Sequence, residues 1–501
     1  MTVAEISAKL ARGRAAFVAW VADLVQQVAD LRAQVTELRA ELTAAEAHRR
    51  SLTAQLQTLE ARLHLDSHNS SKAPSSDQPH RRRHHPPSRA PRSTRPSGGQ
   101  PGHPGHTLVQ VADPDQVVGH RPEACTACGT PFRPGQAADA RHVRQVWDVP
   151  PLRLTVTEHQ VWEVACECCG HVTAGAFPPE VRAPVQYGPY VHALAGYLNV
   201  RQLVPLARLR EFFSDVLGHP LSEASLLTGR GVAAAALAPF QDHLRAQLAQ
   251  APVVGADETG CYVAGKRQWV HVLCTPALTD FELSTRRGTQ TLATHTLLQP
   301  FAGVLLHDAY DCYFQYPCPH ALCNAHLLRD LIFLAEEADE PLALAWQYYL
   351  RQLYGAVQAA RAQGRTRLPP ATLKRWEQKY TRLLSRSLAT TAEVLPPPGR
   401  KRRPKQSKAR NVWERLRDRR AAILRFARDF RVPFDNNQAE RDLRMLKVQQ
   451  KISGNFRSWT GAEEFLRVYG YLLTAQKNGV GAFRALTMLF AGHPYWPPAP
   501  M

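Results

Sequence analysis

The chain has 501 residues, and 62 lysines and arginines against 43 aspartates and glutamates give a formal net charge of +19. This length predicts roughly three to five domains, and a hydrophobic fraction of 44 % excludes a chain that is disordered throughout. No apolar run approaches the roughly 18 residues that cross a bilayer, and the N-terminal residues lack a signal-peptide pattern. We therefore expect a cytoplasmic protein without a membrane partner. The charge favours a polyanion such as DNA, although an arginine-rich proteome would give the same composition.

Residues 1–65 carry a heptad repeat of apolar side chains. The two seams of the repeat consist of Phe17, Leu24, Leu31, Leu38, Ala45, Leu52 and Leu59, and of Val21, Val28, Val35, Leu42, Arg49, Leu56 and Leu63. Two apolar positions in every seven residues predict a parallel two-stranded coiled coil, and hence a homodimer or higher homo-oligomer. The alternative is an amphipathic helix that packs against its own chain.

Residues 66–106 form a proline-rich basic linker. The segment contains Arg81, Arg82 and Arg83, and its prolines interrupt both helices and strands. The like charges repel one another, so we expect an extended segment. It either lies along DNA phosphates or serves as a solvated spacer.

Residues 107–180 contain two cysteine pairs with metal-ligand spacing. Cys125 and Cys128 form one CxxC pair, and Cys166 and Cys169 form the other. Four thiolates suit one tetrahedral structural Zn²⁺. Cys168 competes for the fourth position, but Cys169 restores the two-residue spacing and precedes a glycine. A redox CxxC is the alternative.

The remaining chain predicts a mixed α/β protein with further helical parts. Residues 181–250 are helical and a candidate DNA-binding segment, and 251–337 alternate strands with helices. Strands are expected at 253–257, 268–274, 281–284, 304–306 and 321–323, with a helix over 289–298. Residues 338–430 are a basic helical insertion, 431–480 complete the core, and 481–501 are a C-terminal tail.

Three carboxylates stand where an active site is expected. Asp257 ends one predicted strand, Asp308 follows another, and Glu440 lies near the start of a predicted helix. Carboxylates at neighbouring strand ends, joined by one from a helix, can hold Mg²⁺ or Mn²⁺. Two such ions suit phosphoryl transfer.

The helix that carries Glu440 has a polar face and an apolar face. Asn436, Arg444 and Lys447 share the polar face with Glu440, and we expect Asp435 and Asn436 to cap the helix. The apolar face consists of Ala439, Leu443 and Leu446. The alternative for the polar face is an ordinary solvated surface.

Further basic and metal-ligating residues flank these carboxylates. The run 400–420 includes Lys401, Arg402 and Arg403, and we expect it to contact phosphates. Cys323 and His326 are three residues apart at the start of a predicted helix. With two ligands visible, a structural role beside the active site is the preferred interpretation.

Taken together, these motifs resemble the insertion-sequence 66 family of bacterial transposases. The resemblance rests on the coiled coil, the four-cysteine cluster and six short segments, namely residues 69–77, 98–108, 256–259, 323–326, 435–441 and 451–457.

The resemblance implies a multidomain α/β protein with a ribonuclease-H-like core and a helical insertion. It implies an Asp–Asp–Glu triad of Asp257, Asp308 and Glu440 that cleaves transposon ends and transfers a strand into target DNA. Inverted terminal repeats would then be DNA partners, and companion proteins of the same element are possible partners. The alternatives are a non-catalytic DNA-binding protein derived from a mobile element and a nuclease of the same fold.

Overall fold

The computed structural model describes residues 2–11, 13–63, 65, 107–140, 142–288, 298, 301–395 and 404–498. The chain divides into two compact units. Unit 1 contains Met1–Pro79, Phe240–Lys447 and Pro497–Met501, and unit 2 contains His80–Pro239 and Val448–Trp496. The expected linker with Arg81, Arg82 and Arg83, the expected helix over 289–297 and the residues Lys401, Arg402 and Arg403 lie outside the described residues.

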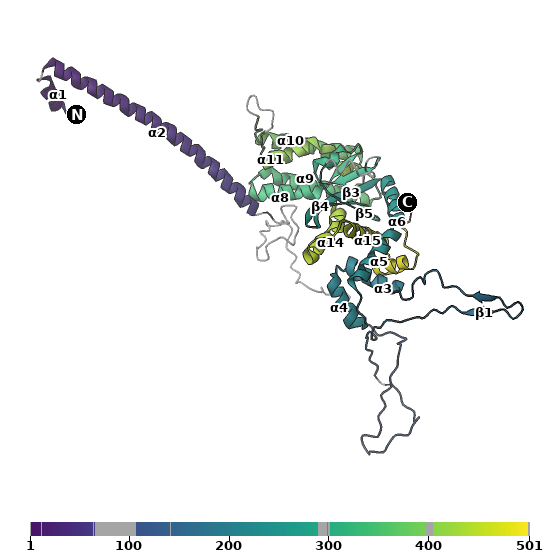
Figure 1. The fold of residues 1–501 in the computed structure, drawn as a ribbon. Helices are drawn as coiled ribbons and strands as arrows, with labels where there is room; N and C mark the ends of the chain where they lie inside the picture. Colours follow the sequence, from purple (N-terminus) through teal and green to yellow (C-terminus); the bar gives the residue numbers. More distant parts are fainter. Residues whose placement is uncertain are drawn as a thin grey trace. The chain divides into compact units, whose positions relative to one another are not determined.

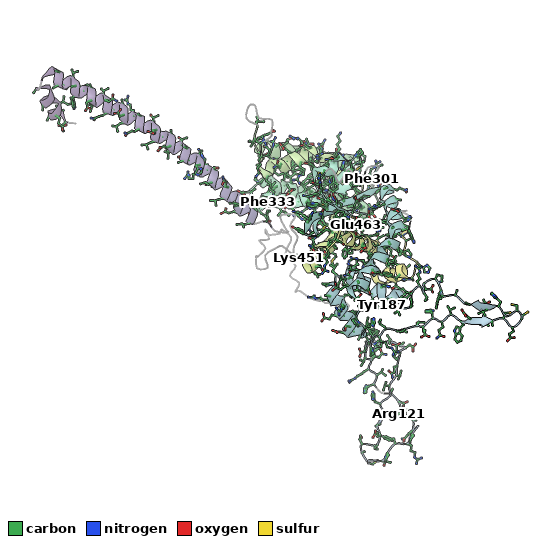
Figure 2. The ribbon with its side chains drawn as sticks, in the orientation of Figure 1. Arg121, Tyr187, Phe301, Phe333, Lys451 and Glu463 are labelled. Carbon is green, nitrogen blue, oxygen red and sulfur yellow. The ribbon has the colours of Figure 1, made fainter. Side chains whose placement is uncertain are left out.

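The N-terminal part forms two helices, α1 (Val3–Leu10) and the 50-residue α2 (Arg14–Leu63). The heptad leucines of α2 stay exposed, with Leu31 59 % and Leu38 62 % accessible. Figure 2 shows the side chains of α2 standing out along its length. The predicted helix is therefore present, and its apolar seam is not covered by the described part of the same chain.

Five strands of unit 1 form one mixed sheet in the order β5-β4-β3-β6-β7. The strands are β3 (Val253–Val263), β4 (Lys266–Cys274), β5 (Thr279–Ser284), β6 (Val304–His307) and β7 (His320–Leu322). β3, β4 and β5 pair antiparallel, whereas β3, β6 and β7 pair parallel. All five predicted strands are present, although β3 runs six residues beyond Asp257, into the turn before β4.

The helices that follow the sheet share one large aromatic core. They are α8 (Asn324–Glu337), α9 (Pro341–Ala362), α10 (Pro370–Thr390), α11 (Lys408–Asp418), α12 (Arg420–Ile423) and α13 (Arg425–Arg428). Trp346, Tyr380 and Trp413 are fully buried in this core, and Trp346 Nε1 donates to Ser387 Oγ at 2.9 Å. The green helices α8–α11 gather into one bundle in Figure 1. The predicted helical insertion is thus a packed structure that continues the core of the sheet.

Unit 2 combines a short hairpin with a helical bundle. The hairpin pairs β1 (Glu163–Ala165) with β2 (Val172–Ala174). The helices are α3 (Pro189–Gly196), the π-helical turn η2 (Tyr197–Arg201), α4 (Leu206–Leu217), α5 (Glu223–Ala236), α15 (Trp459–Lys477) and α16 (Ala482–Phe490). Ser222 caps α5 through its side chain. That helix ends at Ala236, and α6 (Ala238–Gln250) begins separately.

The C-terminal region differs from the expected division of the chain. Residues 481–501 were expected as a tail, yet Ala485 and Leu486 of α16 are fully buried. α15 lies against α5, and α16 lies against α3. Apolar faces on both helices therefore join segments separated by more than 200 residues. None of the helices formed by the described residues is long and apolar enough to cross a membrane.

Candidate active site and metal-binding residues

The pairing of β3 with β6 brings Asp257 and Asp308 into equivalent positions. Gly255 of β3 lies opposite Leu306 of β6 in a parallel ladder. Asp257 lies two residues after Gly255, within β3, and Asp308 lies two residues after Leu306, just past the end of β6. The shared register therefore places them next to each other on one side of the sheet. The two aspartates are thus neighbours because of strand register, although 50 residues separate them in the chain.

Both aspartates resist ionisation in this position. Burial raises the pKa of Asp257 well above its ordinary value, and the charges of Glu258, Asp308 and Glu440 raise it further. Burial and the charge of Glu258 also raise the pKa of Asp308. Buried carboxylates that repel one another are stabilised by a bound cation, and hard oxygen ligands suit Mg²⁺ or Mn²⁺. The donor set therefore fits a divalent metal.

Glu440 reaches this region from α14 (Asn437–Ser453). Its Oε2 lies 3.4 Å from Arg329 Nη2, and its Oε1 lies 3.7 Å from His326 Nδ1. Both partners belong to α8. As predicted, Ala439 and Leu443 of the apolar face of α14 are buried.

The start of α14 is fastened to β3 beside Asp257. Asp435 Oδ1 accepts a bond from the Asn437 N–H at 3.1 Å and caps the helix as expected. Asn436, expected as a second cap, instead donates from Nδ2 to the carbonyl of Ala256 at 2.8 Å. Its side chain is buried against the strand, where an unpaired carbonyl would be costly. Asn436 therefore positions the Glu440 helix on the strand that carries Asp257.

The three carboxylates do not yet meet as one set of metal ligands. Among the residues that the structure describes, the possible group of three with ligand atoms within 4.8 Å of one another consists of Cys323, His326 and Glu440. Glu440 nevertheless lies close enough to raise the pKa of Asp257. The fold thus brings the carboxylates into one region, with Glu440 held toward α8.

A fourth carboxylate, Glu258, lies beside the site and was not singled out from the sequence. Its side chain is only 2 % exposed and pairs with Arg287, whose Nη2 is 2.7 Å from Glu258 Oε1. Tyr313 donates its hydroxyl to Glu258 Oε2 at 2.6 Å. Glu258 follows Asp257 directly in the chain. Its position next to Asp257 was the signal by which the sequence could have identified it. Nothing in the sequence marks Arg287 or Tyr313 as part of the site.

The two cysteine motifs fold into matching turns. Gly129 donates its N–H to the carbonyl of Cys125 at 2.8 Å, and Gly170 donates to the carbonyl of Cys166 at the same distance. Both glycines have positive φ, +72° and +70°, a conformation that glycine adopts without strain. The position of Cys169 before Gly170 therefore corresponds to that of Cys128 before Gly129.

The chemistry of these turns suits thiolate ligands. Hydrogen bonding from Thr130 lowers the pKa of Cys128, and the backbone of Cys169 lowers the pKa of Cys166. Zinc binds the thiolate form. The described residues do not bring the two pairs together within ligand distance, so each turn is a separate half of the expected site.

Several arginines of the basic run after residue 400 pair with carboxylates of the protein itself. Arg410 has a side chain only 9 % exposed and pairs with Glu393 and Glu414, so the expectation that it contacts phosphates is wrong. Arg415 pairs with Asp330 at 2.9 Å. A buried guanidinium needs such partners, because an unpaired charge inside a protein costs several kcal/mol.

The two basic residues predicted on α14 differ from each other. Lys447 donates from Nζ to the carbonyl of Gly260 at 2.8 Å, which ties it to β3, and burial lowers its pKa. Arg444 remains exposed.

The exposed face of α10 carries cations that the sequence analysis did not single out. They are Lys374, Arg375, Lys379, Arg382 and Arg386. Within the described part of the chain, none of the five forms an ion pair with a carboxylate. Lys379 lies 4.7 Å from the ring centre of Trp376.

The matching turns predict which cysteine binds zinc. Replacing Cys169→Ser removes one equivalent of tightly bound zinc relative to the unmodified chain, because Cys169 occupies the position of Cys128. Replacing Cys168→Ser leaves the zinc content unchanged. Atomic absorption of the purified proteins measures both, and loss from the Cys168→Ser variant alone would contradict the assignment.

The raised pKa of Asp257 predicts a pH-dependent change in stability. Its folded pKa lies above the unfolded value of 3.8, so the ionised form costs stability as pH rises from about 4. In EDTA, Asp257→Asn should therefore raise the free energy of unfolding at pH 8, and by less at pH 5. Urea unfolding at both values measures the difference.

A surface aspartate provides a control of opposite sign. Hydrogen bonding from Arg431 lowers the pKa of Asp429, so Asp429→Asn should lower stability at pH 8, by at most about 1 kcal/mol for an exposed pair. An Asp257→Asn variant that is less stable than the unmodified chain in EDTA would overturn the burial argument.

Comparison with known protein families places these observations in context. The model of the family described as "Transposase IS66 family" matches residues 184–464, which is more than half of the chain. A family of unknown function, DUF6444, matches residues 22–109. No curated protein is similar enough to match. The chain belongs to the IS66 family of transposases.

Proposed function

We propose that this chain is a metal-dependent DNA transposase of the Asp–Asp–Glu type, which cleaves transposon ends and joins them to target DNA. The observation that carries the proposal is the register of β3 and β6, which aligns Asp257 with Asp308. Glu440 joins them on a helix that Asn436 fastens to β3. Family membership supports DNA as the substrate.

We also propose that the sheet is a ribonuclease-H-like core. Three antiparallel strands followed by two parallel ones, in the order β5-β4-β3-β6-β7, support this assignment. In such a sheet the first strand lies at the centre and carries the first carboxylate. The second carboxylate, Asp308, directly follows the parallel neighbour β6.

Asp257, Asp308 and Glu440 would hold two Mg²⁺ or Mn²⁺ ions. When bound, the ions activate the attacking oxygen and stabilise the leaving oxygen of the phosphodiester. Asp257 and Asp308 become good ligands once a cation offsets their mutual repulsion. Arg329 holds Glu440 Oε2 from α8.

The reaction then has two displacements at phosphorus. Water attacks the phosphodiester at the transposon end and releases a 3′-hydroxyl group. That hydroxyl attacks a phosphodiester of the target DNA and expels another 3′-oxygen. Both steps need the same carboxylates, since attacking and leaving oxygens exchange roles.

Other parts of the chain would assemble the DNA complex. The exposed heptad seam of α2 would pair with a second copy and bring two transposon ends together. A structural Zn²⁺ held by Cys125, Cys128, Cys166 and Cys169 would join the two cysteine turns. This zinc unit and helices α3–α5 would hold the terminal repeats, and companion proteins of the same element would complete the complex.

The central test replaces Asp257→Asn. Cleavage of a plasmid carrying the DNA that flanks the gene should fall by about 10³ or more, because a ligand of the catalytic ions is lost. DNA binding should persist, since the substitution removes a negative charge. Gel assays of cleavage and fluorescence anisotropy of binding measure the two effects.

The matched control is Asp429→Asn, which removes a surface carboxylate paired with Arg431 and should cleave normally. Full cleavage by Asp257→Asn in Mg²⁺ would refute the assignment. A pre-cleaved end incubated with a target plasmid separates two enzymes of this fold: joined product indicates a transposase, and nicks alone indicate a nuclease.

We place the sequence-independent phosphate contacts on α10. Residues 375, 379, 382 and 386 follow helical spacing and present a row of cations without carboxylate partners among the described residues. Long flexible cations recognise backbone charge and carry no base information. The face therefore suits target DNA of any sequence.

Salt dependence tests this surface. The double substitution Arg382→Gln and Arg386→Gln should reduce the slope of log affinity against log salt concentration by roughly 2, one per lost phosphate contact. The matched control, Arg417→Gln with Arg431→Gln, removes the same charge from arginines already paired with Asp418 and Asp429. Equal slopes in the two double variants would contradict the α10 assignment.

A further inference from the structure

Three side chains that bind transition metals converge between α8 and α14. Cys323 precedes α8, His326 lies in its first turn, and Glu440 lies in the first turn of α14. One ligand atom of each lies within 4.8 Å of the other two. Cys323 and His326 were visible as a ligand pair in the sequence. Glu440, which is 114 residues after His326, joins them only in the folded chain.

Two of the ligand atoms have no hydrogen-bond partner among the residues that the structure describes. They are His326 Nδ1 and Glu440 Oε1, and both atoms are shielded from solvent. They face each other at 3.7 Å, which is too long for a hydrogen bond. Buried polar atoms nearly always have a hydrogen-bond partner or a bound ion, so these two atoms indicate a ligand at this position. A cation between the two atoms would satisfy both.

The third ligand is already oriented. Cys323 is 3 % exposed, and its Sγ accepts the backbone N–H of Asn436 at 3.2 Å. That bond fixes the sulfur beside the start of α14. The loop that fastens α14 to β3 therefore also positions the sulfur toward Glu440.

The donor types discriminate among metals. Mg²⁺ prefers oxygen ligands in octahedral geometry, whereas one sulfur, one imidazole nitrogen and one carboxylate oxygen suit Zn²⁺ or Co²⁺. Three protein ligands leave a fourth tetrahedral position for water or another exchangeable ligand. An ion pair between His326 and Glu440 alone would leave the position of the Cys323 sulfur beside them unexplained.

We propose that Cys323, His326 and Glu440 form a binding site for a transition-metal ion of the Zn²⁺ class. The site shares Glu440 with the proposed Mg²⁺ centre, and this part of the inference rests on the proposed function. An ion bound there holds Glu440 toward α8 and away from the aspartates. Zinc therefore inhibits Mg²⁺-dependent cleavage by withdrawing one carboxylate.

Cobalt binding tests the site without any need for activity. The full-length chain, freed of metal and titrated with Co²⁺, should bind one more equivalent than the Cys323→Ser or His326→Ala variant. The extra ion should contribute a sulfur-to-cobalt absorption band. The matched control is Cys318→Ser, which alters another buried thiol outside the cluster and should keep the full stoichiometry.

Melting temperatures separate folding effects from ligand loss. The comparison uses variants whose metal-free melting temperature matches that of the unmodified chain, and Glu440→Gln serves as a third ligand variant. Equal cobalt stoichiometry in the unmodified chain and the ligand variants would overturn the proposal. Loss of the extra ion in Cys318→Ser as well would also overturn it.

Zinc titration of cleavage tests the shared carboxylate. Added Zn²⁺ should lower the Mg²⁺-dependent rate of the unmodified chain by about tenfold or more, as expected when a ligand of the catalytic ions is withdrawn. The rate of Cys323→Ser, relative to its own zinc-free rate, should stay unchanged. An extra bound ion with zinc-insensitive cleavage would refute the sharing of Glu440. An extra bound ion in a chain that never cleaves DNA would instead refute the proposed function and leave the site intact.

Discussion

The mutual repulsion of buried carboxylates is the constraint on which this structure depends. Asp257 and Asp308 lie on adjacent parallel strands, with Glu258 and Glu440 close by, and burial raises the pKa of both aspartates. An arrangement of this kind costs stability in a metal-free chain. Its persistence is understandable if divalent cations complete the site, because the features that destabilise the empty cluster favour binding of the ions.

A second constraint is the fastening of distant segments to the central strand. The Asn436 side chain donates a hydrogen bond to the carbonyl of Ala256, 180 residues earlier in the sequence. The Lys447 side chain donates to the carbonyl of Gly260, which lies further along the same strand. Thr279 of β5 adds a bond from its hydroxyl to Asp442 at 2.9 Å. α14 is therefore held along the sheet at several points.

The positive charge of the chain has two different uses. In α11 and the turns beside it, arginines such as Arg410 and Arg415 pair with carboxylates and hold the insertion together. On α10 the cations have no carboxylate partner among the described residues. Net charge alone does not separate these uses, because pairing depends on which acidic residues the fold brings near. The carboxylates that pair with Arg410, Arg415 and Arg419 come from three different segments of the chain. They are Glu393, Asp330 and Asp311.

Local pattern in the sequence predicted much of this architecture. The heptads predicted α2, and short strand-like segments predicted the five strands of the sheet. The apolar face of α14 was correctly assigned to Ala439, Leu443 and Leu446. Asp257 and Asp308 were found because they lie at the ends of predicted strands. The short-range CxxC spacing likewise predicted turns that the glycines confirm. Each of these signals lies within a few residues of its consequence.

Tertiary structure decided what depends on contacts between distant segments. It paired Glu258 with Arg287 and Tyr313. It also bonded the Asn436 side chain, expected as a helix cap, to β3, and it buried Arg410. It also packed the expected C-terminal tail as α16 and set Glu440 beside Cys323 and His326. The sequence by itself determined which residues could form helices, strands and metal turns, since those preferences are local. Only folding determined which charges and ligands meet, because burial and strand register act between residues that the chain keeps far apart.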